Sequence, residues 1–245
     1  INLISKKPSG AGTSSRLTIG NYGLKQGQFI GDYSLGENVF AKLSLNQKSR
    51  NGYVGNAASP YQAAQGVVPN STSSHEELDT IDSKGMKFSL LFDGEDTSIN
   101  LSIDRTQQKN IPPFAQLTNT IPNWSSAFGV GASALTGGLK LWPIELFVNE
   151  SRQGVAHINT QTLERSVVTG KSLTLTHSLS IGELKAIWSN RTVNWDDVLD
   201  LDGGPFPIAE TERHTKYDAK TLEIQLSGSS DSIEYVLGYY QIKDD

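Results

Sequence analysis

Alternation of apolar and polar residues with a period of two is the feature that most restricts how this chain folds. In residues 97–104, Ile99, Leu101 and Ile103 alternate with serine, asparagine and aspartate. The pattern recurs in three other segments, 38–50, 169–180 and 215–227. Such alternation is typical of β-strands with one apolar and one wet face. Because no segment keeps a helical period over three turns, the sequence predicts an all-β fold.

The connections between the expected strands are of two kinds. About nine strands are expected, at 15–24, 26–35, 38–50, 83–93, 97–108, 169–180, 183–196, 215–227 and 232–243. Tight turns rich in Gly and small polar or acidic residues lie at 35–38, 93–96, 181–183 and 228–231. Long connections at 51–82, 109–168 and 197–214 alternate with these turns. Short turns at one end and long loops at the other are typical of outer-membrane β-barrels.

Composition excludes several other classes of protein. The 245 residues include no Cys, which rules out disulfide scaffolds, thiolate metal sites and cysteine catalysis. A net charge of −5 without a basic stretch argues against nucleic acid as a partner. The longest charge-free stretch, 111–139, is interrupted by Pro and Gly, so it is expected to be a loop and not a transmembrane helix.

The first eight residues are Ile-Asn-Leu-Ile-Ser-Lys-Lys-Pro, and several short motifs follow them in a characteristic order. This beginning resembles the end of the plug domain of TonB-dependent outer-membrane receptors, where the chain passes into the barrel. Further motifs resemble the first barrel strand, the first periplasmic turn, the top of the third strand, and a later strand with its aromatic partner. They are Leu17–Gly23, Tyr33–Asn38, Arg50–Tyr53, Thr221–Leu226 and Ile233–Tyr240.

The resemblance implies an antiparallel up-and-down transmembrane β-barrel in the outer membrane of a bacterium. Residues 1–8 would end the plug domain, and residues 9–245 would form the N-terminal part of the barrel. Barrels of this family have about 22 strands, so we expect a portion of a longer receptor that by itself is an open, curved sheet. The implied partners are outer-membrane lipid, a nutrient such as a ferric siderophore, and TonB, which would contact the missing part of the plug. Carbohydrates and cobalamin-like molecules are the other possible nutrients.

The candidate ligand-binding residues are aromatic side chains in the long connections, where rings could stack on a ligand. They are Trp124, Phe128, Trp142, Phe147 and Phe206. Packing within the loops is the alternative role for these side chains. Other aromatic residues near strand ends suit the girdle at the membrane interface: Tyr22, Tyr33, Trp188, Trp195, Tyr235, Tyr239 and Tyr240.

An acidic segment is a weak candidate for a cation site. Asp196, Asp197, Asp200 and Asp202 are expected to share one loop, but their spacing is not that of an EF-hand. A solvated acidic loop is the alternative, and neither a metal nor a cofactor is expected.

A soluble or surface-exposed all-β module that binds carbohydrate or another ligand is the alternative function. The alternation fits it equally well, because a period of two does not say whether the apolar face points inward or outward. A β-rich hydrolase is a third possibility. The four His residues are far apart in the sequence and no acid–base constellation stands out, so no enzyme and no catalytic residues are expected.

Overall fold

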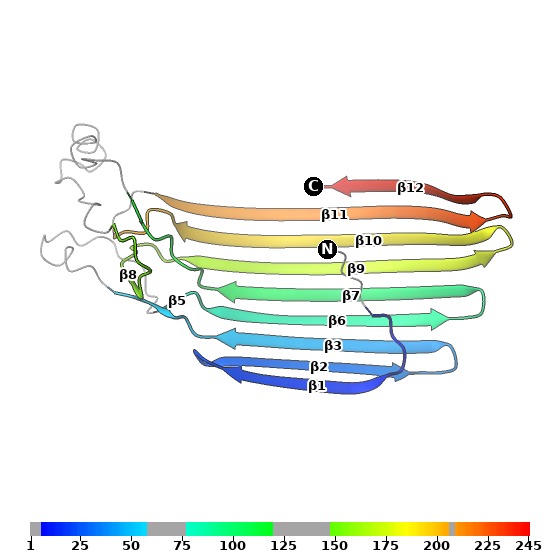
Figure 1. The fold of residues 1–245 in the computed structure, drawn as a ribbon, viewed down its shortest axis with the longest axis horizontal. Coiled ribbons are helices and arrows are strands. Elements are labelled where there is room, and N and C mark those ends of the chain that lie inside the picture. Colours follow the sequence, from blue (N-terminus) through cyan, green and yellow to red (C-terminus); the bar gives the residue numbers. More distant parts are fainter. Residues whose placement is uncertain (1–5, 58–76, 120–147, 206–208) are drawn as a thin grey trace, which may run out of the picture.

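Nine long strands form one antiparallel sheet in the computed structural model, which describes residues 6–57, 77–119, 148–205 and 209–245. They are β1 (Gly12–Gly20), β2 (Leu24–Ser34), β3 (Val39–Arg50), β6 (Ile81–Asp93), β7 (Thr97–Asn110), β9 (Leu163–Leu179), β10 (Gly182–Asp200), β11 (Glu210–Ser229) and β12 (Glu234–Asp244). Each strand pairs with the next in this order, so the sheet is an up-and-down meander (Figure 1). The all-β prediction is confirmed.

The sheet is open. Within the described residues, β1 and β12 each pair with a strand on one side only. This agrees with the expected open sheet. No described helix is long and apolar enough to cross a membrane.

Short turns and long connections lie at opposite ends of the sheet, as predicted (Figure 1). We call these the turn end, on the right of Figure 1, and the loop end, on the left. One hairpin departs from the predicted strict alternation. The connection between β1 and β2 is only residues 21–23, yet it lies at the loop end, where Asn51 donates a hydrogen bond to the Tyr22 carbonyl. Left-handed φ angles of 58° at Tyr22 and 64° at Gly23 allow this tight hairpin.

Strands β9, β10 and β11 extend further toward the loop end than predicted, with 17, 19 and 20 residues. The expected loop at 197–214 is therefore too long, because β10 continues to Asp200 and β11 begins at Glu210. Alternation stops before these strands do. The segments beyond the predicted bounds are 163–168 (Leu-Glu-Arg-Ser-Val-Val), 197–200 (Asp-Val-Leu-Asp) and 210–214 (Glu-Thr-Glu-Arg-His), and none of them alternates. Without a period of two, the sequence does not indicate a strand.

A second, three-stranded sheet lies at the loop end. Its strands are β5 (Glu77–Leu78), β4 (Val54–Asn56) and β8 (Val155–Ala156), in that order. Its buried apolar side chains are Val54, Leu78, Ala156 and Ile158. Strands of two or three residues are too short for periodicity to reveal, so the sequence did not predict this sheet.

The two faces of the nine-stranded sheet differ in chemistry. Residues paired across antiparallel strands share a face, so the register assigns each side chain to one side. One row of paired residues is apolar throughout: Ala41, Leu90, Leu101, Leu173, Trp188 and Leu222. The next row points to the opposite face and is polar throughout: Lys42, Ser89, Ser102, Ser172, Ser189 and Thr221. We call these the outer face and the inner face.

The apolar outer face is the more exposed of the two. Leu173 and Trp188 on the outer face are 42% and 41% exposed, whereas Ser89 and Ser102 on the inner face are 6% and 8% exposed. The hydroxyl groups of these two serines are hydrogen-bonded at 2.7 Å. Water-soluble proteins bury their apolar side chains. The reverse arrangement is that of a membrane barrel, in which apolar side chains point outward and polar ones inward.

The apolar side chains of the outer face form a band that crosses the strands obliquely. Toward the loop end, the band ends at Leu45 in β3 and at Tyr239 in β12, and the pairing places Tyr239 in the row of Val39. Val39 and Leu45 are six residues apart, so the edge shifts by about 20 Å along the strands at ~3.3 Å per residue. From β3 to β12 there are six strand spacings, which is about 29 Å of sheet at ~4.8 Å each. The resulting angle, about 35°, lies within the range of strand tilts in outer-membrane barrels.

Candidate functional site on the inner face and at the loop end

The segment before β1 is attached to the inner face of the sheet. In Figure 1 the described part of this segment passes over β3 and β2 before it enters β1. Asp32 of β2, which is 2% exposed, accepts hydrogen bonds from the backbone N–H groups of Ser9 and Gly10, both at 2.9 Å. The Ser9 hydroxyl donates a third bond at 3.2 Å, and the Lys42 Nζ lies 3.3 Å from the carboxylate. Because Asp32 and Lys42 are paired on the inner face, the chain enters the barrel wall from that side.

A glycine allows this segment to lie close to the sheet. Gly10 has a φ of +71°, and a Cβ placed there would lie 3.3 Å from the backbone nitrogen of Ser34. A larger residue would be strained in this left-handed conformation. The described part of the predicted plug ending, residues 6–8, includes a buried Pro8. Residues 1–5 lie outside the described residues, and the division into a plug ending at residue 8 and a barrel from residue 9 stays a prediction.

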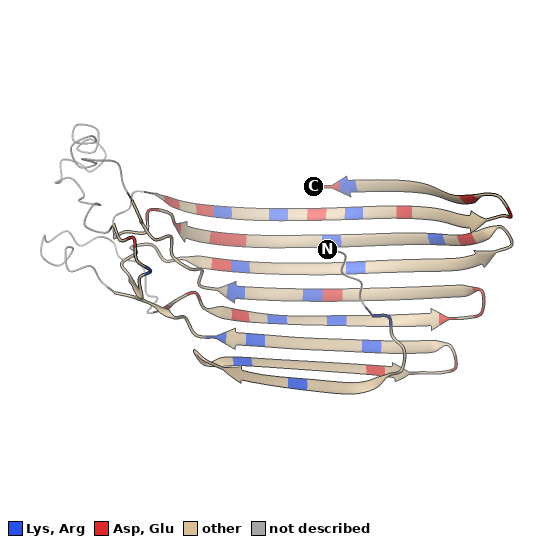
Figure 2. Cartoon of the chain, viewed as in Figure 1, with Lys and Arg blue, Asp and Glu red and all other residues tan. Residues whose placement is uncertain are grey.

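The inner face is largely polar, and several of its strand charges form ion pairs. Arg191 of β10 contacts Asp104 of β7 at 3.5 Å across the intervening strand β9. Gly170 of β9 lies between them, and a Cβ at this glycine would be 2.5 Å from Oδ1 of Asp104. The glycine therefore leaves the space through which the two charges meet. Figure 2 shows that acidic residues also gather at the tight turns.

The acidic residues predicted to share a loop do not form one site. Asp196 and Asp197 lie in β10, where successive residues point to opposite faces. Asp196 contacts Nδ1 of His214 at 2.9 Å on the outer face. Asp197 is 3% exposed and pairs on the inner face with Arg213, whose guanidinium lies 5.4 Å from the Trp195 ring centroid.

The other two carboxylates organise the connection from β10 to β11. Asp200, which is 3% exposed, accepts a hydrogen bond from the Gly203 N–H at 2.9 Å. Burial, reinforced by the charge of Asp202, raises the pKa of Asp200 to about 7. Asp202 accepts bonds from the N–H groups of Gly204 at 2.9 Å and Ala209 at 3.0 Å. No group of three or more His, Asp or Glu side chains in the described ranges is placed to hold a metal ion.

An aromatic and cationic cluster at the loop end was not predicted. The Tyr53 ring lies 5.1 Å from the Arg50 guanidinium and 5.4 Å from that of Arg152. The Tyr22 ring lies 5.7 Å from the Tyr53 ring, tilted by 51°. The segment Arg50–Tyr53 resembles a motif at the top of the third barrel strand, but the contact between Tyr53 and Arg152 joins residues about a hundred positions apart in the chain. No local pattern in the sequence could reveal such a contact.

The predicted aromatic residues have different outcomes. Trp124, Phe128, Trp142, Phe147 and Phe206 all lie outside the described residues, so their role stays a prediction. Among the girdle candidates, Tyr33, Trp188, Tyr235 and Tyr239 lie on the outer face, as a girdle requires. Trp195 and Tyr240 share a face with Thr215 and Glu223, which is the inner one, so their assignment to the girdle is wrong.

Comparison with known proteins identifies the fold. No family model matches the chain, and no curated protein has a matching sequence. The fold is similar to that of the siderophore receptor PiuA from Acinetobacter baumannii, with a TM-score of 0.63 and 12% identity over 95% of this chain and 30% of that one. The ferric yersiniabactin uptake receptor FyuA from Yersinia pestis has a TM-score of 0.60 and 11% identity, over 95% of this chain and 29% of that one. The ferric-catecholate import receptor Fiu from E. coli has a TM-score of 0.57 and 14% identity, over 98% of this chain and 35% of that one.

These matches confirm the predicted likeness to receptor barrels at the level of the fold. The chain spans about a third of the length of each of these receptors.

Proposed function

We propose that this chain forms the first part of the barrel wall of a bacterial outer-membrane receptor that takes up a scarce nutrient, and that this nutrient is a ferric siderophore. The observation that carries the proposal is the oblique apolar band on the exposed face, with a polar face behind it. A wall of this kind separates lipid from a wet lumen. Similar structures are named as siderophore or iron-chelate receptors, which supports the choice of nutrient.

The attachment of residues 9 and 10 to the inner face supports a plug that lies inside the barrel. In this proposal, residues 1–8 end the plug, residues 9–245 begin the barrel, and TonB acts on plug segments outside this chain. The buried Asp32 carboxylate would then hold the last link between the two domains in place while the plug moves.

The ligand would bind at the loop end. The described residues on either side of the connections from β3 to β6, from β7 to β9 and from β10 to β11 lie at this end. The candidate contacts belong to the parts of these connections outside the described residues, and they are Trp124, Phe128, Trp142, Phe147 and Phe206. At the same end the Tyr53 ring contacts Arg50 and Arg152. Arg50 is paired with Asp79 at 2.9 Å, so Arg152 supplies the net positive charge beside the ring. An aromatic ring beside a positive charge favours an anionic, partly aromatic ligand, such as the catecholate that one of the similar receptors is named for. No catalytic step is part of the proposal.

The soluble binding module is disfavoured by a single physical argument. Its exposed apolar band would be in contact with water across nine strands, and contiguous apolar patches of that size are rare on soluble monomers. A barrel wall in lipid removes this difficulty.

The test is iron uptake by cells that lack the gene encoding this chain. Iron-starved cells are given radioactive iron bound to a catecholate, a hydroxamate or a phenolate siderophore. We expect uptake of one of these chelates to fall to background and to be restored by the gene on a plasmid. Inactivation of TonB in the parent strain should abolish the same uptake.

Two other results would separate the parts of the proposal. If uptake of cobalamin or of an oligosaccharide falls instead, the chain belongs to a nutrient receptor and the siderophore is wrong. If uptake of every tested nutrient is unchanged and the protein is recovered in the soluble fraction, the receptor itself is refuted.

A further inference from the structure

Basic residues follow the loop-end edge of the apolar band on the outer face. In four strands, the first outer-face residue beyond the band is basic: Lys84 in β6, Arg105 in β7, Lys171 in β9 and Lys220 in β11. All four are exposed. Lys84, Arg105 and Lys171 make no ion pair within the described parts of the chain. Along the turn-end edge of the band, the described outer face carries neither Lys nor Arg.

Several basic residues on the inner face have acidic partners. Lys42 pairs with Asp32, Arg191 with Asp104 and Arg213 with Asp197. The outer-face row lacks such partners at Lys84, Arg105 and Lys171, and it lies where side chains pass from the apolar band into the polar zone. Unpaired positive charge along one edge of an apolar band complements a layer of anionic headgroups above lipid tails.

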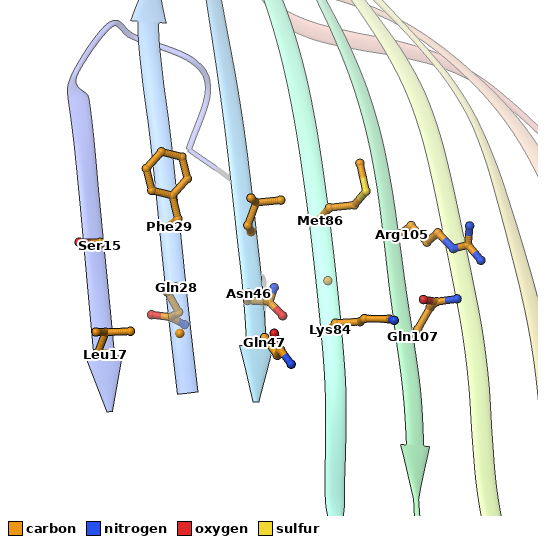
Figure 3. Close-up of a pocket in the computed structure, with 13 residues that line it drawn as sticks. Ser15, Leu17, Gln28, Phe29, Asn46, Gln47, Lys84, Met86, Arg105 and Gln107 are labelled. Atoms are coloured by element: carbon orange, nitrogen blue, oxygen red, sulfur yellow. The ribbon is translucent and has the colours of Figure 1, made fainter. Parts of the chain in front are cut away.

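A groove on the outer face joins the basic edge to the apolar band (Figure 3). Its volume is about 680 Å³. Gly27 leaves its floor open, because this outer-face residue has no side chain. Toward the turn end the groove is lined by Phe29, Leu45 and Met86, and toward the loop end by Gln47, Lys84 and Gln107, with Arg105 beside Met86.

We propose that this groove binds one phosphorylated lipid of the leaflet on the loop side. The phosphate would lie between Lys84 and Arg105, which are diagonal neighbours on β6 and β7, with Cβ atoms about 7 Å apart. The amides of Gln47 and Gln107 can donate further hydrogen bonds to it. An acyl chain would run over Gly27 toward Phe29, Leu45 and Met86. The inference rests on the membrane location in the proposed function but not on nutrient uptake.

The test measures lipid binding by the protein expressed from its complete gene and purified from membranes in dodecyl maltoside. Native mass spectrometry is used to titrate dimyristoyl phosphatidic acid, dimyristoyl glycerol and inorganic phosphate. We expect phosphatidic acid to bind and the other two not to bind at the same concentrations. Lys84→Gln together with Arg105→Gln should weaken the binding roughly thirtyfold, as expected for two charges near a lipid surface.

Two further variants identify the groove. Gly27→Leu would fill the floor, and a Cβ there meets only Leu17, at 3.7 Å, so the strand can accept it. This variant should bind dimyristoyl phosphatidic acid more weakly and bind short-chain dihexanoyl phosphatidic acid as the parent protein does. Lys48→Gln removes a charge at a similar height on the inner face and should change the binding of neither lipid. Heat-modifiable migration on gels confirms that each variant is folded.

Unchanged binding in the double variant, or equal binding of inorganic phosphate, would overturn the lipid site. In both cases a protein that stays in washed membranes leaves the proposed location intact. Recovery of the protein as a soluble species would instead refute the location.

Discussion

Two buried carboxylates, Asp32 and Asp200, hold segments of the chain in place by accepting backbone hydrogen bonds. Asp32 and Asp200 are both nearly inaccessible to solvent, and both accept hydrogen bonds from backbone N–H groups. Asp32 also has Lys42 beside it, which offsets the cost of burying its charge. Asp200 has only other carboxylates as charged neighbours, so its charge is not offset. The two therefore respond differently to pH.

The connection between β10 and β11 should loosen as the pH rises from 3.8 to about 7, the unfolded and folded pKa values of Asp200. Burial holds the pKa of Asp200 near 7 in the folded state, against 3.8 for the ordinary group. Below 3.8 the carboxyl is protonated whether folded or unfolded, so its contribution to stability is complete. As the pH rises further, Asp200 ionises first in the unfolded form, and its contribution to the stability of the connection is lost by the time the pH passes the folded pKa.

Hydrogen exchange checks this prediction. With intrinsic rates corrected for pH, amides in residues 200–204 should open roughly tenfold or more often at pH 8 than at pH 5. Asp200→Asn should remove the difference while its side-chain oxygen keeps the bond from Gly203. Exchange that is equally pH-dependent in the variant would show that another group is responsible.

At the scale of the strand, successive residues face two different media. Leu101 lies in an apolar row that runs from β3 to β11, and its neighbour Asn100 lies on the polar inner face. Replacing one or the other by lysine adds the same charge at almost the same depth. In the proposed membrane location, only the outer replacement would place that charge in lipid.

Leu101→Lys should therefore impair assembly, and Asn100→Lys should be tolerated. A lysine on the lipid face near the membrane centre costs about 2–4 kcal/mol. The folded fraction in isolated outer membranes, measured by heat-modifiable migration on gels, should fall for Leu101→Lys and remain near the parent value for Asn100→Lys. Equal loss in both variants would contradict the assignment of faces.

For the whole molecule, the oblique band determines how the strands would be tilted in the proposed membrane location. A tilt of about 35° is what closure into a barrel of this class requires. Trp188 lies within the band on the outer face, whereas Trp195, only seven residues later in the same strand, lies on the inner face and beyond the band. The two tryptophans therefore report on orientation.

Lipids with brominated acyl chains should quench Trp188 and spare Trp195. The measurement uses variants that keep one tryptophan each, with the others replaced by phenylalanine, reconstituted into vesicles of brominated phosphatidylcholine. Quenching of Trp195 with Trp188 spared would mean that the inner face is the one in contact with lipid.

Local sequence was sufficient for the strands, the tight turns and the two-faced character of the sheet, because these depend on neighbours within a few residues. Ile99, Leu101 and Ile103 alternate with polar residues whatever lies beside them. Tertiary structure decided the rest. It turned the apolar face outward, carried β10 and β11 beyond the last alternating residue, and brought Asp32 to Ser9 and Arg152 to Tyr53. These features depend on which strands are paired and on which side of the sheet the chain passes, and a period of two is the same for a strand whose apolar side meets a protein core and one whose apolar side meets lipid.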